Sequence, residues 1–174
     1  MAGIWEIKEA NQVAVGILHT DNVTMHWAFG LRNLKLPGRD DLRMWDPFIP
    51  VTGMPFDHAK NSCVAGMLSR QYCEWIFFLD SDVVPPSNVI LKLLSFKLPV
   101  VSGVYFRRSP PHAVPVMIKY GSWYTNYPRG KLIEVDLVGA GCLLVHRSVF
   151  ERVPPQEPHQ QLKDEAAGVT KVIS

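Results

Sequence analysis

In the stretch WIFFLDSD, at residues 75–82, five large apolar residues run directly into two carboxylates separated by one serine. The run is short and aromatic and a proline pair at 85–86 follows it, so it predicts a strand rather than a helix. A continuous apolar run is typical of a strand covered on both faces, as in a parallel sheet between helices. Such sheets bind ligands beyond the carboxyl ends of their strands, where Asp80 and Asp82 emerge.

The two carboxylates predict a metal site. In an extended chain, residues i and i+2 point the same way, so Asp80 and Asp82 can face one ligand. Two adjacent anions repel each other unless a positive charge lies between them, and a hard divalent cation with oxygen ligands meets that need. We therefore expect Mn²⁺ or Mg²⁺ here, with a solvated acidic turn as the alternative.

Strand and helix patterns alternate through the first part of the chain. Apolar residues at helical spacing separate short runs rich in β-branched and aromatic residues. The predicted strands are 12–19, 48–52, 75–80 and 99–105, and the predicted helices are 23–36, the segment opened by Asp57, and 85–96. This order predicts an α/β fold with right-handed crossovers, Rossmann-like, with a mostly parallel central sheet flanked by helices.

The pattern changes after the fourth predicted strand. Three short strands are expected at 114–120, 132–137 and 142–146, with turn residues between them. They predict a smaller mixed-strand portion within a single domain at residues 1–153. Residues 154–174 lack aromatic side chains and are rich in polar ones, so we expect a loosely held polar tail that contributes little to the core.

Net charge, hydropathy and the cysteine pattern indicate which partners and which cellular location to expect. The net charge of +2 without a run of like charges gives no reason to expect nucleic acid. No stretch approaches the roughly 20 apolar residues of a membrane span, and no signal peptide is visible. Cys63, Cys73 and Cys142 are far apart in apolar surroundings, which favours reduced core cysteines and a cytoplasmic location.

Several motifs together resemble the nucleotide-binding half of a GT-A glycosyltransferase, most like family 2. The tripeptide Ala59-Lys60-Asn61 stands where that family has Ala-Arg-Asn, one helix before its Asp-x-Asp strand. Segments 100–105 and 138–145 are also similar to the family, and the likeness spans residues 12–153. It implies metal-dependent transfer of a sugar from a nucleotide diphosphate sugar donor to an acceptor that the sequence does not name.

The resemblance also assigns roles around the acidic motif. Asp80 would contact the ribose or the metal, Asp82 would ligate the metal, and Ser81 between them would lie against the nucleotide. Lys60 would approach the nucleotide with charge but without the two-pronged geometry of arginine, or it is simply a solvated lysine of the first helical turn.

Residues from other segments complete the implied donor site. Thr20 and Asp21 stand where the family contacts the base and ribose. Asp57 shares that task or serves as a plain helix cap. Gly139 and Gly141 let the backbone approach the sugar closely, or they form a tight turn between strands.

The catalytic base is where this chain departs from the family. Inverting members take the base from an acidic pair on a later helix, and the matching region here is absent or replaced by the polar tail. Asp164-Glu165 is an acidic pair without the apolar helical context. Asp136 is our candidate for the catalytic residue, with a turn-capping role as its alternative.

Two rival interpretations remain open. The string at 77–84 also resembles motif I of haloacid-dehalogenase-type phosphatases, in which Asp80 would be the nucleophile and Asp82 the general acid/base. That motif normally ends the first strand of its domain, whereas two predicted strands precede it here. The other rival is a non-catalytic nucleotide-sugar-binding module.

Overall fold

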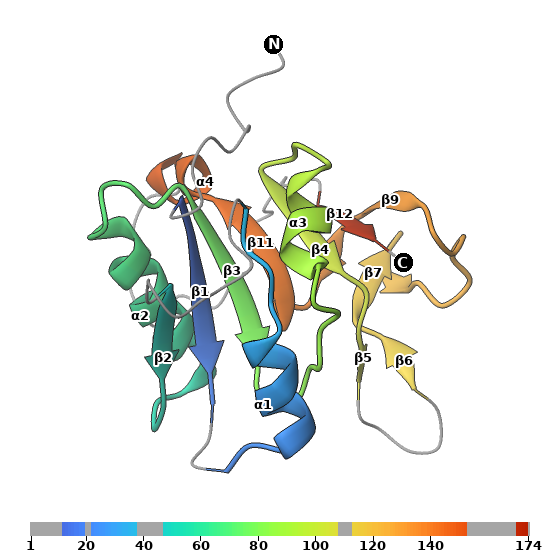
Figure 1. The fold of residues 1–174 in the computed structure, drawn as a ribbon. Coiled ribbons are helices and arrows are strands. Elements are labelled where there is room, and N and C mark those ends of the chain that lie inside the picture. Colours follow the sequence, from blue (N-terminus) through green and yellow to red (C-terminus); the bar gives the residue numbers. More distant parts are fainter. Residues whose placement is uncertain (1–11, 20–21, 38–46, 108–112, 153–169, 174) are drawn as a thin grey trace.

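The computed structural model describes residues 12–19, 22–37, 47–107, 113–152 and 170–173. Within these residues the fold centres on a seven-stranded sheet with strand order β2-β1-β3-β11-β4-β12-β9 (Figure 1). Its strands are β1 (Val13–Leu18), β2 (Phe48–Val51), β3 (Trp75–Asp80), β4 (Val100–Gly103), β9 (Leu132–Val135), β11 (Cys142–His146) and β12 (Thr170–Ile173). The helices are α1 (Met25–Arg32), α2 (Phe56–Leu68), α3 (Val89–Leu94) and α4 (Arg147–Arg152).

The α/β architecture predicted from the sequence is confirmed, but the sheet is mixed. β1 pairs in parallel with β2 on one side and with β3 on the other. β11 runs antiparallel between β3 and β4, and β9 runs antiparallel to β12. The sheet is therefore parallel through β2, β1 and β3 and mixed beyond them, where only β4 and β12 pair in parallel.

Helices cover both faces of β3, which explains its unbroken apolar run. Trp75, Phe77 and Leu79 face a core built with α1 and α3, where Trp27 and Ile90 are buried. The alternate residues of β3 face a second core built with α2 and α4 (Figure 1). Because successive side chains of a strand point to opposite faces, each position of β3 up to Leu79 needs an apolar side chain.

Helix α2 packs on the sheet through small residues. Its buried positions are Ala59, Cys63 and Met67, spaced four apart. A Cβ on Gly16 of β1 would lie 3.1 Å from Cβ of Cys63, so helix and strand are in close contact there. All three cysteines are buried and free, and burial raises the pKa of Cys63 to about 11.

The prediction of a separate mixed-strand portion is wrong for two of its three strands. Most of the strand predicted at 132–137 and all of the strand predicted at 142–146 belong to the main sheet, as β9 and β11. The strand predicted at 114–120 contributes to two small sheets beside the main one. They are formed by β5 (Phe106–Arg107) with β6 (Val114–Pro115), and by β7 (Met117–Lys119) between β8 (Ser122–Trp123) and β10 (Leu137–Val138). Met117, Ile133 and Val135 form a separate small core that joins β7 to β9.

The expectation of a loosely held tail at residues 154–174 is wrong at the end of the chain. Thr170–Ile173 forms β12, which is paired in parallel with β4 and antiparallel with β9. Four residues without a flanking turn signal gave no periodicity from which to predict a strand. Their position inside the sheet comes from backbone pairing to two neighbours. Asp164 and Glu165 lie outside the described residues.

None of the helices in the described part of the chain is long and apolar enough to cross a membrane.

Candidate functional site

The carboxyl ends of the neighbouring strands β1 and β3 lie side by side at one end of the sheet. From β1 the chain crosses to β2 on one side, then returns to β3 on the other side of β1. Leu18, the last residue of β1, is in register with Asp80, the last residue of β3. In α/β sheets a reversal of strand order of this kind opens a ligand site beyond the strand ends.

The backbone around Asp80 is fixed from two sides. Its N–H donates to the carbonyl of Gly141 at 3.1 Å, and its carbonyl accepts from Nε1 of Trp27 at 3.0 Å. The next N–H, that of Ser81, donates to the carbonyl of Leu18 at 3.1 Å. These bonds hold the carboxylate of Asp80 at a defined place where β3 ends.

One carboxylate oxygen of Asp80 is left without a hydrogen bond. Oδ1 is buried and has no hydrogen-bond partner among the described residues. Nζ of Lys60, on α2, approaches it to 3.6 Å, which is an ion-pair distance but longer than a hydrogen bond. A buried, unsatisfied carboxylate oxygen is costly, so this atom is suited to receive a ligand.

The surroundings of Asp80 disfavour an isolated negative charge. Burial raises the pKa of Asp80, the Lys60 ammonium opposes this rise, and the neighbouring Asp82 adds to it. Asp82 itself is exposed. A positive group between the two carboxylates would stabilise both ionised forms.

The carboxylate pair fits a divalent metal for which water and substrate, rather than the protein, supply most of the ligands. Among the described residues there is no group of three or more His, Cys, Asp or Glu side chains that could enclose a metal. Mg²⁺ is commonly held by one or two carboxylates together with substrate phosphates, rather than by an all-protein cage. The unsatisfied Oδ1 of Asp80 is compatible with such a site, and Asp82, in the turn that follows β3, would supply the second carboxylate.

Tyr105 completes the site, and the sequence analysis missed it. Its hydroxyl oxygen accepts the N–H of Gly141 at 3.0 Å. A Cβ on Gly141 would lie 2.8 Å from Oδ2 of Asp80 and 2.9 Å from Cζ of Tyr105. A Cβ on Gly139 would clash with the Tyr105 hydroxyl and with Val116. The two glycines are therefore required by the tyrosine and the carboxylate packed against them.

We expect Tyr105→Phe to lower the free energy of unfolding by about 1–2 kcal/mol, because the part-buried N–H of Gly141 loses its acceptor. The substitution should also weaken ligand binding at Asp80. Gly141 connects the two residues, because its N–H donates to Tyr105 and its carbonyl accepts the N–H of Asp80. Urea denaturation and calorimetry measure the two effects. Tyr120→Phe is the matched control, because Tyr120 is 85% exposed and should tolerate the change. Equal stability of both variants would contradict the role of this hydrogen bond.

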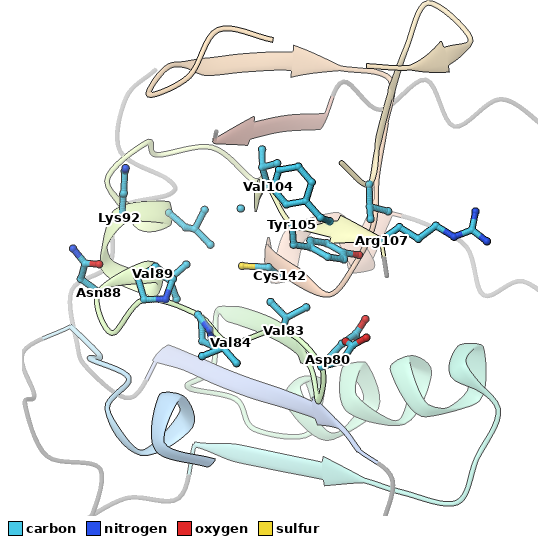
Figure 2. A pocket seen from close by; sticks show the side chains of 17 residues that line it. Asp80, Val83, Val84, Asn88, Val89, Lys92, Val104, Tyr105, Arg107 and Cys142 are labelled. Atoms are coloured by element: carbon cyan, nitrogen blue, oxygen red, sulfur yellow. The ribbon is translucent and has the colours of Figure 1, made fainter. Parts of the chain in front are cut away.

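Two cavities meet at the acidic motif. The larger, about 660 Å³, is lined by Asp80, Asp82 and Tyr105 and by apolar residues of the β3–α3 loop and α3 (Figure 2). The smaller, about 380 Å³, lies at the ends of β1 and β2 and includes Ser81. A ligand that passes over residues 80–82 would therefore reach a cavity on each side.

Other predicted site residues are only partly gathered here. Lys60 lies against Asp80, with its Nζ also 5.7 Å from the ring centroid of Phe56. Asp57 is exposed in the first turn of α2 and is not the helix cap, since the N-cap is Pro55 and no side chain caps the helix. Thr20 and Asp21 lie outside the described residues.

The side chain of Asp136 is hydrogen-bonded to a turn residue and not to the acidic motif. It is exposed between β9 and β10, and its carboxylate accepts the N–H of Tyr120 at 2.6 Å. Tyr120 has a φ of 54°, so this bond stabilises a left-handed residue in the turn between β7 and β8. Asp136 lines neither of the two cavities. Asp136 thus caps a turn, but it is the turn between β7 and β8 and not the glycine-containing turn at 139–141 that follows it.

Comparisons with known proteins define the fold alone. No family model matches the chain, and no curated protein matches it. Among solved structures, the chain is similar to the crystal structure of A197 from STIV, with a TM-score of 0.61 and 15% sequence identity. The match covers 82% of this chain and 69% of that one. The class that the fold defines is a mixed α/β protein.

Proposed function

We propose that the protein is a metal-dependent glycosyltransferase of GT-A type that uses a nucleotide diphosphate sugar. The observation that carries this proposal is the buried, unsatisfied Oδ1 of Asp80 at the switch point of the sheet, beside Lys60 and one residue from Asp82. It supports a site that holds a cation and, through it, a phosphate-bearing ligand. The motif order that resembles family 2 supplies the sugar-transfer chemistry.

The two cavities suit the two ends of such a donor: the nucleoside at one end and the sugar, with the acceptor beside it, at the other. The smaller cavity, at the ends of β1 and β2, is lined by apolar and small polar groups, including Val51, Thr52 and Phe56. We assign it to the nucleoside. The diphosphate would then cross residues 80–82, which directs the sugar toward the larger cavity.

Mn²⁺ or Mg²⁺ bound by Asp80 and Asp82 would stabilise the charge that develops on the departing diphosphate. In the transfer, the bond between the sugar carbon and the diphosphate oxygen breaks with its electron pair leaving on oxygen. The acceptor oxygen forms the new bond to that carbon and gives up its proton. The residues around Asp80 bind and orient the donor. Asp136 stays a sequence-based prediction for the base, and a cytoplasmic location likewise stays a prediction.

Nucleotide-sugar turnover tests the proposal against its phosphatase rival. The protein is incubated with Mn²⁺ and a panel of nucleotide diphosphate sugars, and ³¹P NMR follows the products. We expect slow release of nucleoside diphosphate, which Asp80→Asn abolishes, and no phosphate on the protein. Inorganic phosphate as the product, with an aspartyl-phosphate at Asp80 in the acid-quenched protein, would instead establish the phosphatase. Binding without release would support the non-catalytic module.

A further inference from the structure

The larger cavity has an apolar wall that a donor sugar does not need. Beside Asp80 and Tyr105, its lining includes Val83, Val84, Val89, Leu93, Phe106 and Val116. Figure 2 shows Val83, Val84 and Val89 along one side of this space, with Asp80 at one end. A hydroxyl-rich ligand placed against such a wall would lose hydrogen bonds to water without replacement, which is unfavourable.

The apolar surface continues outward from the cavity. Val84 is 54% exposed and Phe106 is 49% exposed, on segments that follow β3 and β4. Gly30 of α1 packs against the same loop, since a Cβ on it would lie 3.2 Å from Cγ1 of Val84. Exposed apolar side chains that adjoin one cavity are typical of a binding surface.

The charged groups of the lining lie at the ends of the cavity. Besides the carboxylates, two cationic side chains line it, Lys92 and Arg107. Figure 2 shows Arg107 on the side of Asp80 and Lys92 on the opposite side. With a metal on the carboxylates, the end of the cavity near Arg107 would carry positive charge, which complements an anionic group.

We propose that this cavity binds the acceptor, and that the acceptor is an anionic amphiphile. Its aliphatic chain lies on Val84, Val89 and Phe106, and its phosphate or carboxylate head group lies toward Arg107, beside the donor. The proposal rests on the proposed function, because it assigns the second substrate of the same site. The volume of the larger cavity, about 660 Å³, is within the usual range for a small-molecule site.

Titration with n-alkyl phosphates, from butyl to octyl, tests the proposal in the presence of Mn²⁺ and nucleoside diphosphate. We expect affinity to rise about fourfold per methylene until the cavity is filled. Val84→Ser should weaken octyl phosphate binding about fivefold. Val23→Ser is the matched control, because Val23 is 42% exposed and lines neither cavity. Affinity that is independent of chain length would overturn the proposal, as would equal losses in the two variants.

The head group is tested with n-alkyl glucosides of equal chain length. They should bind about threefold more weakly than the phosphates, and Arg107→Gln should remove that difference. Arg129→Gln, at an exposed turn residue that does not line the cavity, should leave it unchanged. Equal affinity of phosphate and glucoside in the unmodified protein would overturn the anionic assignment.

Two further comparisons are informative. One distinguishes a lipid-borne acceptor from a free one, and the other distinguishes failure of this inference from failure of the proposed function. Sedimentation with phosphatidylcholine vesicles that contain phosphatidic acid, lost in Val84→Ser, would assign a lipid-borne acceptor. Binding of alkyl phosphates without vesicle sedimentation would assign a free one. Metal-dependent nucleotide binding without chain-length dependence would overturn this inference and leave the proposed function standing. Chain-length dependence without nucleotide binding would overturn the function, and the assignment as acceptor with it.

Discussion

Asp82→Ala is expected to remove the gain in nucleoside diphosphate affinity that Mn²⁺ gives the unmodified protein. Asp80 is held by the backbone and paired with Lys60, so it can still contact the ligand. Without the second carboxylate, however, the cation loses a charged oxygen ligand. We expect a loss of at least tenfold in the presence of Mn²⁺, an order of magnitude that corresponds to about 1.4 kcal/mol. Calorimetric titration with Mn²⁺ and with EDTA measures it.

Two companion variants make this result specific. Asp82→Asn keeps the shape of the side chain but loses its charge, so it should behave like Asp82→Ala. Glu134→Ala removes an equal charge from an exposed position on β9 that lines neither cavity, and it should keep the full effect of Mn²⁺. A metal effect that survives in Asp82→Ala would remove Asp82 from the metal site.

Val172→Pro is expected to lower the free energy of unfolding by about 2–3 kcal/mol. β12 has partners on both sides, β4 and β9, so its backbone N–H groups face neighbouring strands. Proline removes one donor and leaves a carbonyl in the sheet without its partner. Thermal and urea denaturation measure the change.

Val172→Ala is the control for this variant, because it shortens the side chain and keeps the backbone donor. We expect it to be the less destabilised of the two. A Val172→Pro variant as stable as Val172→Ala would show that the end of the chain does not pair within the sheet, and would restore the expectation of a loosely held tail.

The core of the fold was readable because its signals are local. The run from Trp75 to Leu79 predicted a strand buried on both faces, and it is one. The helix predicted at 85–96 is present as α3, although it begins at Val89 rather than at the proline pair and ends at Leu94. Such patterns depend only on the spacing of apolar residues along one segment.

The features that the sequence did not predict depend on contacts between segments. Ala59 and Cys63 are buried because α2 lies close to Gly16, and small side chains give little hydropathy signal. Tyr105 belongs to the site because Gly139 and Gly141, more than thirty residues later, leave room for its ring. The acidic motif could be located at the end of a strand from the sequence, whereas Tyr105, which packs against it, could not.

Whether the unsatisfied carboxylate of Asp80 takes part in a metal-dependent nucleotide site can be measured by calorimetry. The unmodified protein is titrated calorimetrically with a panel of nucleoside diphosphates, once with Mn²⁺ and once with EDTA. We predict that at least one nucleoside diphosphate binds, and that it binds at least about tenfold more tightly with Mn²⁺. Equal affinity under the two conditions, or no binding by any member of the panel, would contradict a metal-dependent nucleotide-sugar site at Asp80 and Asp82.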